Sequence, residues 1–316
     1  MSNTKTYSKL RLFTLTGLFL MLLFGPLFQP PTLAKPPEGK FLVIGTGPAG
    51  PEHATLKAIE SIKKADLLIC SDSIEKRFAE YLQDKKIMST RPWKDMFSYK
   101  GHSWRKLRQS DPELIKEFHQ NRIAKRECLI GQIKEKMREG KTVALLNSGD
   151  PCLFGPCHWF VEGFDPTNVE IIPGVGAFSA AMAALKKSSI PAYDARFVMQ
   201  TAPEFLFGPS PASKKQTESA VLTGISQYPG TLAFYMALPE IRSLVQQLKA
   251  HYPDTLPIAI VYYAGFPEKE KVVKTNLSDI MQKIKNMDEN WLGMVIVGRC
   301  LEGKPYQTRL EQMPRK

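Results

Sequence analysis

Residues 40–50 read KFLVIGTGPAG, an apolar run that leads directly into a turn of glycine and proline. This pattern is typical of a buried strand that ends in a ligand-binding loop of an α/β fold. The three glycines match G-x-G-x-x-G, and Asp72 follows at the end of the next predicted strand, so the loop has the outline of a dinucleotide fingerprint. Pro48 and Pro51 each remove an N–H donor that a pyrophosphate would need, and they count against a nicotinamide-dependent oxidoreductase. The loop predicts a close approach of the backbone to a ligand and leaves the ligand open.

Two further loops of small residues follow predicted strands. Residues 148–155 read SGDPCLFG after the strand 142–146, and residues 172–178 read IPGVGAF after the strand 169–172. Carboxyl ends of parallel strands meet at one edge of a sheet, where α/β proteins bind ligands. We therefore expect the three loops to form one small-molecule site, with the carboxylate of Asp150 at that edge.

The pattern of strands and helices predicts a largely parallel α/β fold in two domains. The first domain is expected over 39–188, with a long amphipathic helix that Asp111 caps and Gly140 ends. The second domain is expected over 191–305, with residues 205–230 as a loop region. The expected strands are 40–45, 67–70, 142–146, 169–172, 231–236, 258–263, 271–274 and 294–297, and the expected helices besides the long one are 51–64, 177–185, 240–250 and 277–285.

Composition narrows the class of protein. The 316 residues are 43% hydrophobic and 23% charged, which excludes intrinsic disorder. The formal net charge is +12, which favours an anionic partner, and no nucleic-acid recognition motif accompanies the charge. The five cysteines and five histidines show no spacing typical of metal ligands, so we predict no metal. Cys152 and Cys157 are either two small buried side chains or, in an exported protein, a pair.

The first 34 residues resemble a targeting segment. Three basic residues precede an apolar run over 12–28, and Thr32-Leu33-Ala34 resembles a cleavage site. We interpret 1–34 as a signal peptide or an N-terminal membrane anchor, and a misplaced start codon is the third alternative. The expected location is outside the cytosol or tethered to a membrane, and a body that faces the cytoplasm stays open as an alternative.

Six segments, in order, resemble the tetrapyrrole (corrin/porphyrin) methylases, which use S-adenosylmethionine (SAM). The resemblance covers residues 40–302, and two stretches, ADLLICSDS (65–73) and VYYAGFPEKEKVV (261–273), look closest to the cobalt-precorrin-4 C11-methyltransferase branch of cobalamin synthesis. The six segments begin FLVIG, VALLN, VEIIP, TLAFY, IAIVY and MVIVG. The resemblance implies two α/β domains with the active-site cleft between them, a tetrapyrrole substrate rich in carboxylates, and SAM as cofactor. We also expect a homodimer.

The resemblance also implies which residues contact SAM. They come from the three loops of the first domain and from two positions of the second domain. The residues are Pro48, Ser148, Gly149, Asp150, Leu153, Gly176, Ala177, Met236 and Ala264. By position, Asp72 is the candidate base that removes a proton from the acceptor, with a helix cap as the alternative, and Arg91 is the candidate contact to a substrate carboxylate, with an ordinary surface arginine as the alternative.

Three departures from the family pattern stand out. Gly176 replaces the usual Thr or Ser, residues 92–125 look like an insertion, and the family works in the cytosol, where SAM is made. Two other functions remain open. Tyr99, Arg122 and Arg126 favour a peptide-backbone N-methyltransferase of the borosin type, and the export-like start favours a non-catalytic exported tetrapyrrole-binding protein.

Overall fold

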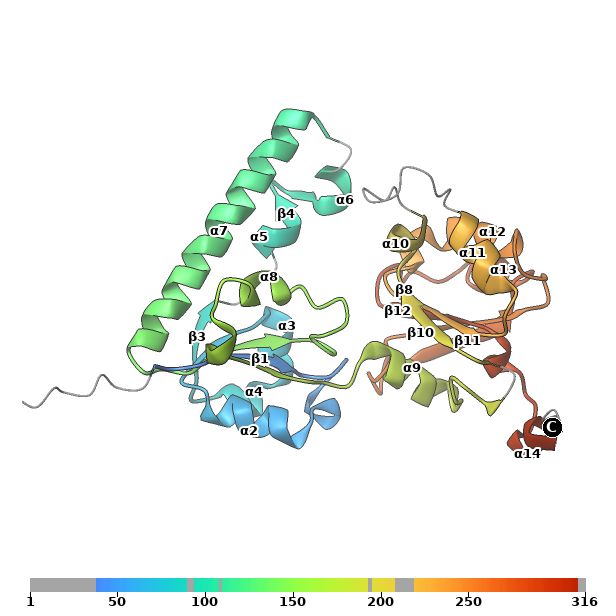
Figure 1. The fold of residues 1–316 in the computed structure, drawn as a ribbon, viewed down its shortest axis with the longest axis horizontal. Coiled ribbons are helices and arrows are strands. Elements are labelled where there is room, and N and C mark those ends of the chain that lie inside the picture. The colour runs from blue at the N-terminus through green and yellow to red at the C-terminus, as the bar shows by residue number, and fades with distance from the viewer. Residues whose placement is uncertain (1–37, 90–93, 108–109, 193–194, 208–218, 312–316) are drawn as a thin grey trace, which may run out of the picture. The chain divides into compact units, whose positions relative to one another are not determined.

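Two five-stranded sheets, joined in sequence by helix α9, organise the chain (Figure 1). The structure is a computed structural model, and it describes residues 38–89, 94–107, 110–192, 195–207 and 219–311. Within this part of the chain, the α/β class predicted from the sequence is confirmed, because strands alternate with helices and helices cover both faces of each sheet.

The first sheet is parallel throughout. Its strands lie in the order β3-β2-β6-β1-β7, so that β1 is flanked by β6 and β7. All three of the predicted loops therefore leave neighbouring strands at the same edge. The strands are β1 (Phe41–Gly45), β2 (Leu67–Ile69), β3 (Lys86–Ser89), β6 (Val143–Asn147) and β7 (Val169–Ile172).

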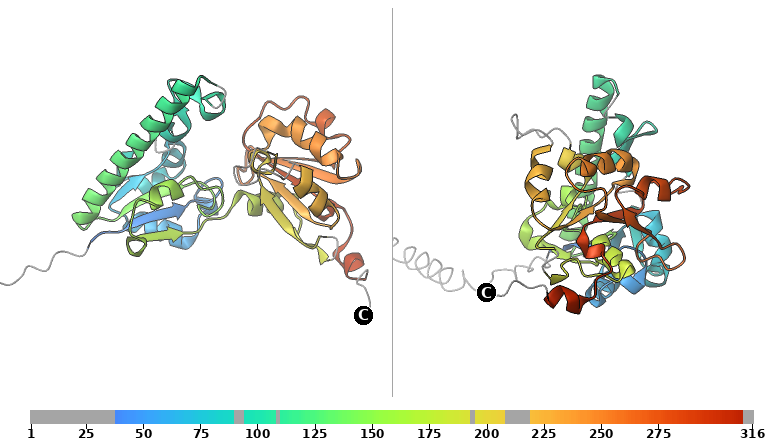
Figure 2. Two further views of the ribbon diagram at one scale, coloured as in Figure 1. Left: turned by 45° about the horizontal axis from the view of Figure 1, so that its top comes forward. Right: turned by 90° about the vertical axis from the view of Figure 1, so that its right-hand side faces the viewer.

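Alternate residues of β1 enter two different cores. Leu42 and Ile44 pack with helix α2 (Leu56–Lys64), whereas Phe41 and Val43 pack with α7 (Pro112–Arg138) and α8 (His158–Val161). This alternation follows from the two-residue period of a strand. Figures 1 and 2 show α2 and α7 on opposite faces of the sheet. The remaining helical segments of this half are η1 (Pro51–His53), α3 (Asp72–Arg77), α4 (Ala79–Leu82) and η2 (Pro166–Asn168).

The second sheet is mixed, which differs from the largely parallel arrangement predicted. Its order is β11-β10-β12-β9-β8, and only β8 and β9 run parallel. The physical reason lies in the connection 263–270 between β10 and β11, which holds no crossover helix, so the next strand must return antiparallel. The strands are β8 (Val198–Thr201), β9 (Thr231–Phe234), β10 (Pro257–Tyr262), β11 (Lys271–Asn276) and β12 (Gly293–Val297).

Helices also cover the second sheet on both faces. Helices α11, α12 and α13 pack on one face, and α9 packs on the other (Figure 1). Since α9 follows β7 directly, the chain changes cores at Gly174–Gly176, ahead of the predicted domain boundary; the domain limits themselves stay a prediction. The helical segments are α9 (Ala177–Leu185), α10 (Pro203–Phe207), α11 (Ser219–Ser226), η4 (Leu238–Glu240), α12 (Ile241–Lys249), α13 (Ile280–Lys283), η5 (Arg299–Leu301) and α14 (Tyr306–Glu311).

The long helix and the predicted insertion take the expected places. The Asp111 side chain accepts the N–H of Glu113 at 2.8 Å, so it caps α7 as predicted. Before it lie α5 (Lys94–Phe97), a small hairpin of β4 (Ser98–Tyr99) and β5 (His102–Ser103), and α6 (Trp104–Leu107), none of which was predicted. The predicted loop 205–230 likewise includes α11 and part of α10, while its residues 208–218 lie outside the described part of the chain.

The three strand-end loops touch through their backbones. The N–H of Thr46 donates to the carbonyl of Asn147 at 2.9 Å, and the N–H of Gly149 donates to the carbonyl of Gly47 at 2.7 Å. Gly174 closes the group, because a β-carbon there would lie only 2.3 Å from the carbonyl oxygen of Gly149. Glycine is required at this position by the lack of space, and the loops are held together without side chains.

We predict that Gly174→Ala destabilises the protein by about 1–3 kcal/mol, because the added methyl group must displace backbone. Gly131→Ala is the matched control. Gly131 lies inside α7 with nothing within 4 Å of the added carbon, so alanine should stabilise the helix by roughly 0.5–1 kcal/mol. Urea unfolding followed by circular dichroism measures both free energies. Equal stability of Gly174→Ala and the wild-type protein would contradict the packing described.

Candidate functional site

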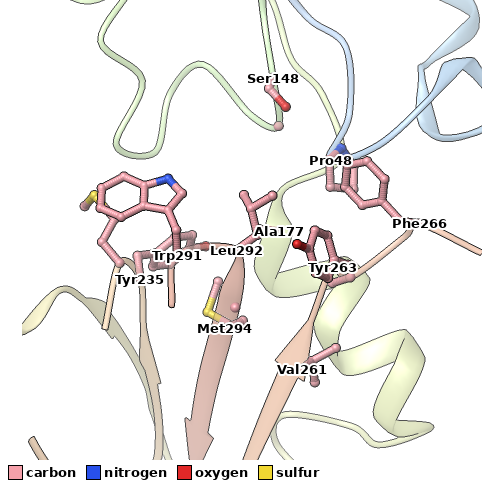
Figure 3. Close-up of a pocket in the computed structure, with 14 residues that line it drawn as sticks. Pro48, Ser148, Ala177, Tyr235, Val261, Tyr263, Phe266, Trp291, Leu292 and Met294 are labelled. Atoms are coloured by element: carbon pink, nitrogen blue, oxygen red, sulfur yellow. The ribbon is translucent and has the colours of Figure 1, made fainter. Parts of the chain in front are cut away.

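A pocket opens at the edge where the strand-end loops meet, and it holds about 230 Å³ (Figure 3). Its walls come from both halves of the body. The first half contributes the loops after β1 and β6 and the start of α9, and the second half contributes the ends of β9 and β10 and the loop before β12. The lining residues are Pro48, Ser148, Gly149, Ala177, Tyr235, Met236, Val261, Tyr263, Ala264, Phe266, Trp291, Leu292, Gly293 and Met294.

The pocket brings together six of the nine residues predicted to contact a cofactor. These six are Pro48, Ser148, Gly149, Ala177, Met236 and Ala264. Asp150, Leu153 and Gly176 lie in the same loops but do not line the pocket. Residues far apart in sequence therefore meet at one place, while their contact with a cofactor stays a prediction.

The loop after β6 presents backbone to the pocket. Gly149 has a φ of +76°, a conformation that favours glycine, and open space lies where a β-carbon would be. The side chain of Asp150 turns back on its own loop, where it accepts the N–H of Cys152 at 2.9 Å. The carboxylate of Asp150 thus shapes the turn, and Ser148 and Gly149 are the residues of this loop that line the pocket.

The second half supplies most of the aromatic surface. Tyr235, Tyr263, Phe266 and Trp291 line the pocket, and none of them was predicted. Tyr235 and Tyr263 directly follow β9 and β10, so the strand-end signal that identified the first three loops would have found them as well. Trp291 stands in the loop before β12 and carries no such signal.

Backbone strain is concentrated around the pocket. Met236 and Tyr263, which line it, have φ values of +52° and +51°, and Phe154 of the neighbouring loop has a φ of +55°. Bulky residues avoid this left-handed region, and such strain tends to gather at functional sites. The ring of Phe154 packs on that of Tyr235, with centroids 4.9 Å apart, which links the loop after β6 to the end of β9.

The described residues that line the pocket include no charged side chain. Of the polar side chains that line it, Tyr235 is neutral, because burial raises its pKa to about 12, and its hydroxyl donates to Gln200 Oε1 at 2.8 Å. Burial likewise raises the pKa of the Cys152 thiol, with Asp150 adding to the effect. The site can therefore bind an aromatic group between apolar walls, and the described residues that line it include no carboxylate that would lie beside a bound cation.

Of the two predicted catalytic residues, the structure describes Asp72 alone, and Asp72 does not line the pocket. Asp72 is exposed in the first turn of α3, and Ser71 caps that helix by accepting the N–H of Ile74 at 3.3 Å. Ser71, and not Asp72, is therefore the cap of this helix. The role of Asp72 as a base stays a prediction. Arg91 lies outside the described residues.

Arg122 and Arg126 attach the long helix α7 to the body, and Tyr99 packs within the predicted insertion. The guanidinium groups of Arg122 and Arg126 lie 5.8 and 5.6 Å from the ring centroid of Trp159, and Arg126 Nε donates to the carbonyl of Trp159 at 2.5 Å. Tyr99 packs against Phe118, with centroids 6.2 Å apart. These contacts give the three residues that favoured a peptide N-methyltransferase a structural role. In the described ranges, no group of His, Cys, Asp or Glu could hold a metal ion.

The chain is similar to curated methyltransferases over most of its length. It is 27% identical over 271 residues to a cobalt-precorrin-4 C(11)-methyltransferase of Methanocaldococcus jannaschii, covering 84% of this chain and 90% of that protein. It is 25% identical to a uroporphyrinogen-III C-methyltransferase of the same organism, covering 83% of this chain and 97% of that protein.

Solved structures share the fold. A cobalt-precorrin-4 methyltransferase described as a cobalamin biosynthetic enzyme superposes with a TM-score of 0.62 at 22% identity, covering 83% of this chain and 96% of that one. A uroporphyrin-III C-methyltransferase of Thermus thermophilus, solved with S-adenosylhomocysteine, gives a TM-score of 0.53 at 20% identity, covering 83% and 99%.

These findings correct the prediction of export or a membrane tether. The prediction depended on the apolar run 12–28, which lies outside the described residues. Gly25-Pro26 interrupts this run, and the run is shorter than the roughly 20 residues of a spanning helix. No helix that the structure describes is long and apolar enough to span a bilayer. The prediction is wrong, because the chain matches cobalt-precorrin-4 methyltransferases, one of them a cobalamin biosynthetic enzyme, over most of its length.

The family model carries the identification. The model of the tetrapyrrole (corrin/porphyrin) methylases matches residues 40–281, which include the first sheet, every strand of the second sheet except β12, all three strand-end loops and most of the pocket. With the fold and the relatives in agreement, the chain belongs to the tetrapyrrole (corrin/porphyrin) methylase family.

Proposed function

We propose that the protein transfers the methyl group of SAM to a carbon atom of an anionic tetrapyrrole of the cobalamin branch. The single observation that carries this proposal is the uncharged pocket in which six predicted SAM contacts meet. The uroporphyrin-III C-methyltransferase of the same fold that was solved with S-adenosylhomocysteine supports SAM as the cofactor. SAM supplies an electrophilic methyl group on a positively charged sulfur.

Uncharged walls suit this chemistry. The sulfonium charge disappears as the methyl group leaves, so a carboxylate beside the sulfur would stabilise the ground state more than the transition state and slow the reaction. The Asp150 carboxylate is held in its own turn and does not line the pocket. The protein then has to align the methyl donor with the acceptor and exclude water. In a well-oriented site this alignment lowers the activation free energy by several kcal/mol.

The acceptor is inferred from the relatives and from charge. The relative from Methanocaldococcus jannaschii, which is 27% identical, is named as a methyltransferase of cobalt-precorrin-4. Residues 35–316 carry +9 of the +12 net charge, because the first 34 residues hold three basic side chains and no acidic one. A macrocycle with several carboxylates is the matching partner, and a homodimer without nucleic acid remains part of the proposal.

Turnover tests the proposal directly. The protein is incubated with SAM labelled in its methyl group and with cobalt-precorrin-4, uroporphyrinogen III or a mixed peptide library as acceptor. We expect label in a tetrapyrrole product, identified by mass spectrometry, and none in peptides. Label in peptides alone would favour the borosin type of reaction and contradict the tetrapyrrole acceptor.

We predict that Ala177→Leu weakens S-adenosylhomocysteine binding by at least about tenfold, because the larger side chain enters a pocket that ligand must fill. Isothermal titration calorimetry measures the dissociation constant. Ser179→Leu is the matched control, since it places the same side chain at an exposed position of the same helix α9. Similar losses in both variants would show that the pocket is not the binding site.

We predict that Gly176→Ser strengthens both the fold and cofactor binding. Gly176 is the N-cap of α9 with an extended backbone and no side-chain cap, and a β-carbon there meets only Asp150 Cβ, at 3.7 Å. Serine should stabilise the helix by a few tenths of a kcal/mol, about the usual difference between these caps. Restoring the family's hydroxyl should also tighten S-adenosylhomocysteine binding, measured by calorimetry beside thermal unfolding. Weaker binding in a variant of unchanged stability would contradict the expected contact.

A further inference from the structure

One carboxylate ties two walls of the pocket together. Glu289 lies between α13 and β12, in the loop that also carries Trp291 and Leu292. Its Oε1 atom accepts the N–H of Trp291 at 2.5 Å and the N–H of Leu292 at 2.9 Å. Its Oε2 atom accepts the hydroxyl of Tyr263, which follows β10. Three donors from two segments therefore converge on one side chain.

The loop before β12 depends on these bonds because burial contributes little to its position. Trp291 is 51% exposed and Leu292 is 46% exposed, although both line the pocket. The backbones of the two segments also meet where the N–H of Tyr263 donates to the carbonyl of Leu292 at 3.0 Å. The hydrophobic effect, which fixes most core residues, is weak for side chains that remain half in water.

Tyr263, which donates to Glu289 from the other segment, has an unfavourable backbone conformation. Tyr263 lines the pocket with a φ of +51°, which costs of the order of 1–3 kcal/mol for a residue with a side chain. The hydroxyl bond to Glu289 is among the interactions that oppose this strain, together with ring contacts to Phe266, with centroids 6.0 Å apart, and to Lys269 Nζ, 5.7 Å from the ring centroid. Figure 3 shows Tyr263 with its hydroxyl directed toward Leu292.

The carboxylate suits the role in its ionised form. Hydrogen bonding from Tyr263 is the largest influence on the pKa of Glu289, and together with the backbone N–H groups it lowers that pKa. An ionised carboxylate only accepts hydrogen bonds, and here all three of its named partners donate. Hydrogen bonds to a charged acceptor are also stronger than those between neutral groups.

We propose that Glu289 is a positioning residue of the donor pocket, which sets the Trp291–Leu292 wall against Tyr263 and thereby sets the affinity for the methyl donor. It lines no part of the pocket and touches no reacting atom. The inference rests on the proposed function, because the donor is SAM only if that function holds. No SAM contact was predicted in the loop of Glu289, Trp291 and Leu292. Tyr263 lies next to the predicted contact Ala264.

Three variants separate positioning from general stability. Glu289→Ala removes all three bonds. Glu289→Gln keeps an oxygen for the two backbone N–H groups and offers an N–H to the Tyr263 hydroxyl, so it is the conservative variant. Asp165→Ala is the matched control, because Asp165 accepts the N–H of Thr167 at 2.9 Å in a loop that does not line this pocket.

Calorimetry with S-adenosylhomocysteine gives the first readout. We expect Glu289→Ala to weaken binding by at least about tenfold, Glu289→Gln by no more than about threefold, and Asp165→Ala not at all. Binding of Glu289→Ala within about twofold of the wild-type value would overturn the proposal. Equal losses in the Ala and Gln variants would overturn it as well, since the hydrogen-bond pattern would then not be what matters.

A second readout does not need a ligand. Fluorine NMR of protein labelled with fluorotryptophan reports the surroundings of Trp291, whose resonance is assigned by its loss in Trp291→Phe. We expect Glu289→Ala to shift or broaden this resonance, and Asp165→Ala to leave it unchanged. If the wild-type protein failed to bind S-adenosylhomocysteine, the proposed function would fall and the donor role with it. An unshifted Trp291 resonance in Glu289→Ala would overturn the positioning claim alone.

Discussion

The rest of the structure depends on the close backbone contact between the loops that follow β1, β6 and β7. The N–H of Gly149 meets the carbonyl of Gly47 at 2.7 Å, and Gly174 leaves no room for a β-carbon beside the carbonyl of Gly149. Glycines permit this approach, and the parallel order β6-β1-β7 requires it, because all three strands end at the same edge. The α9 helix starts from this point and enters the core of the second sheet, so the contact also sets where the second half begins.

The pocket combines this edge with a wall that is held in a different way. On the first half, Ser148, Gly149 and Ala177 are placed by backbone bonds and by the start of a helix. On the second half, the backbone N–H groups of the half-exposed residues Trp291 and Leu292 donate to the carboxylate of Glu289. The carboxylates of Glu289 and Asp150 do not line the pocket, and each accepts backbone N–H donation from a loop that does. This division suits a reaction in which a positive charge vanishes.

The sequence predicted the first half of the site well because strand-end loops of a parallel sheet must converge. Of the nine contacts that the family resemblance implied, four line the pocket from this half, and Met236 and Ala264 line it from the second half. The second sheet was harder, because the alternation of strands and helices does not reveal that 263–270 lacks a crossover helix. Trp291 could not be predicted, since an isolated aromatic residue in a loop has no periodicity. Asp72 shows the limit of position alone: its place at the end of β2 was right, yet Ser71 caps the helix and Asp72 is exposed. An apolar N-terminal run suggested export, and the family relatives contradict it.

A crystal structure of the protein with S-adenosylhomocysteine tests the central claim most directly, since that claim is that one uncharged pocket binds the methyl donor. We predict electron density for the ligand between the Ser148–Gly149 backbone, Ala177 and the wall of Tyr263 and Trp291, with no carboxylate beside the sulfur. A second cavity of about 360 Å³ lies in the second half, lined by Tyr252 and Arg299 among others. Ligand in that cavity, or ligand whose sulfur lies against the carboxylate of Asp150, would contradict the account.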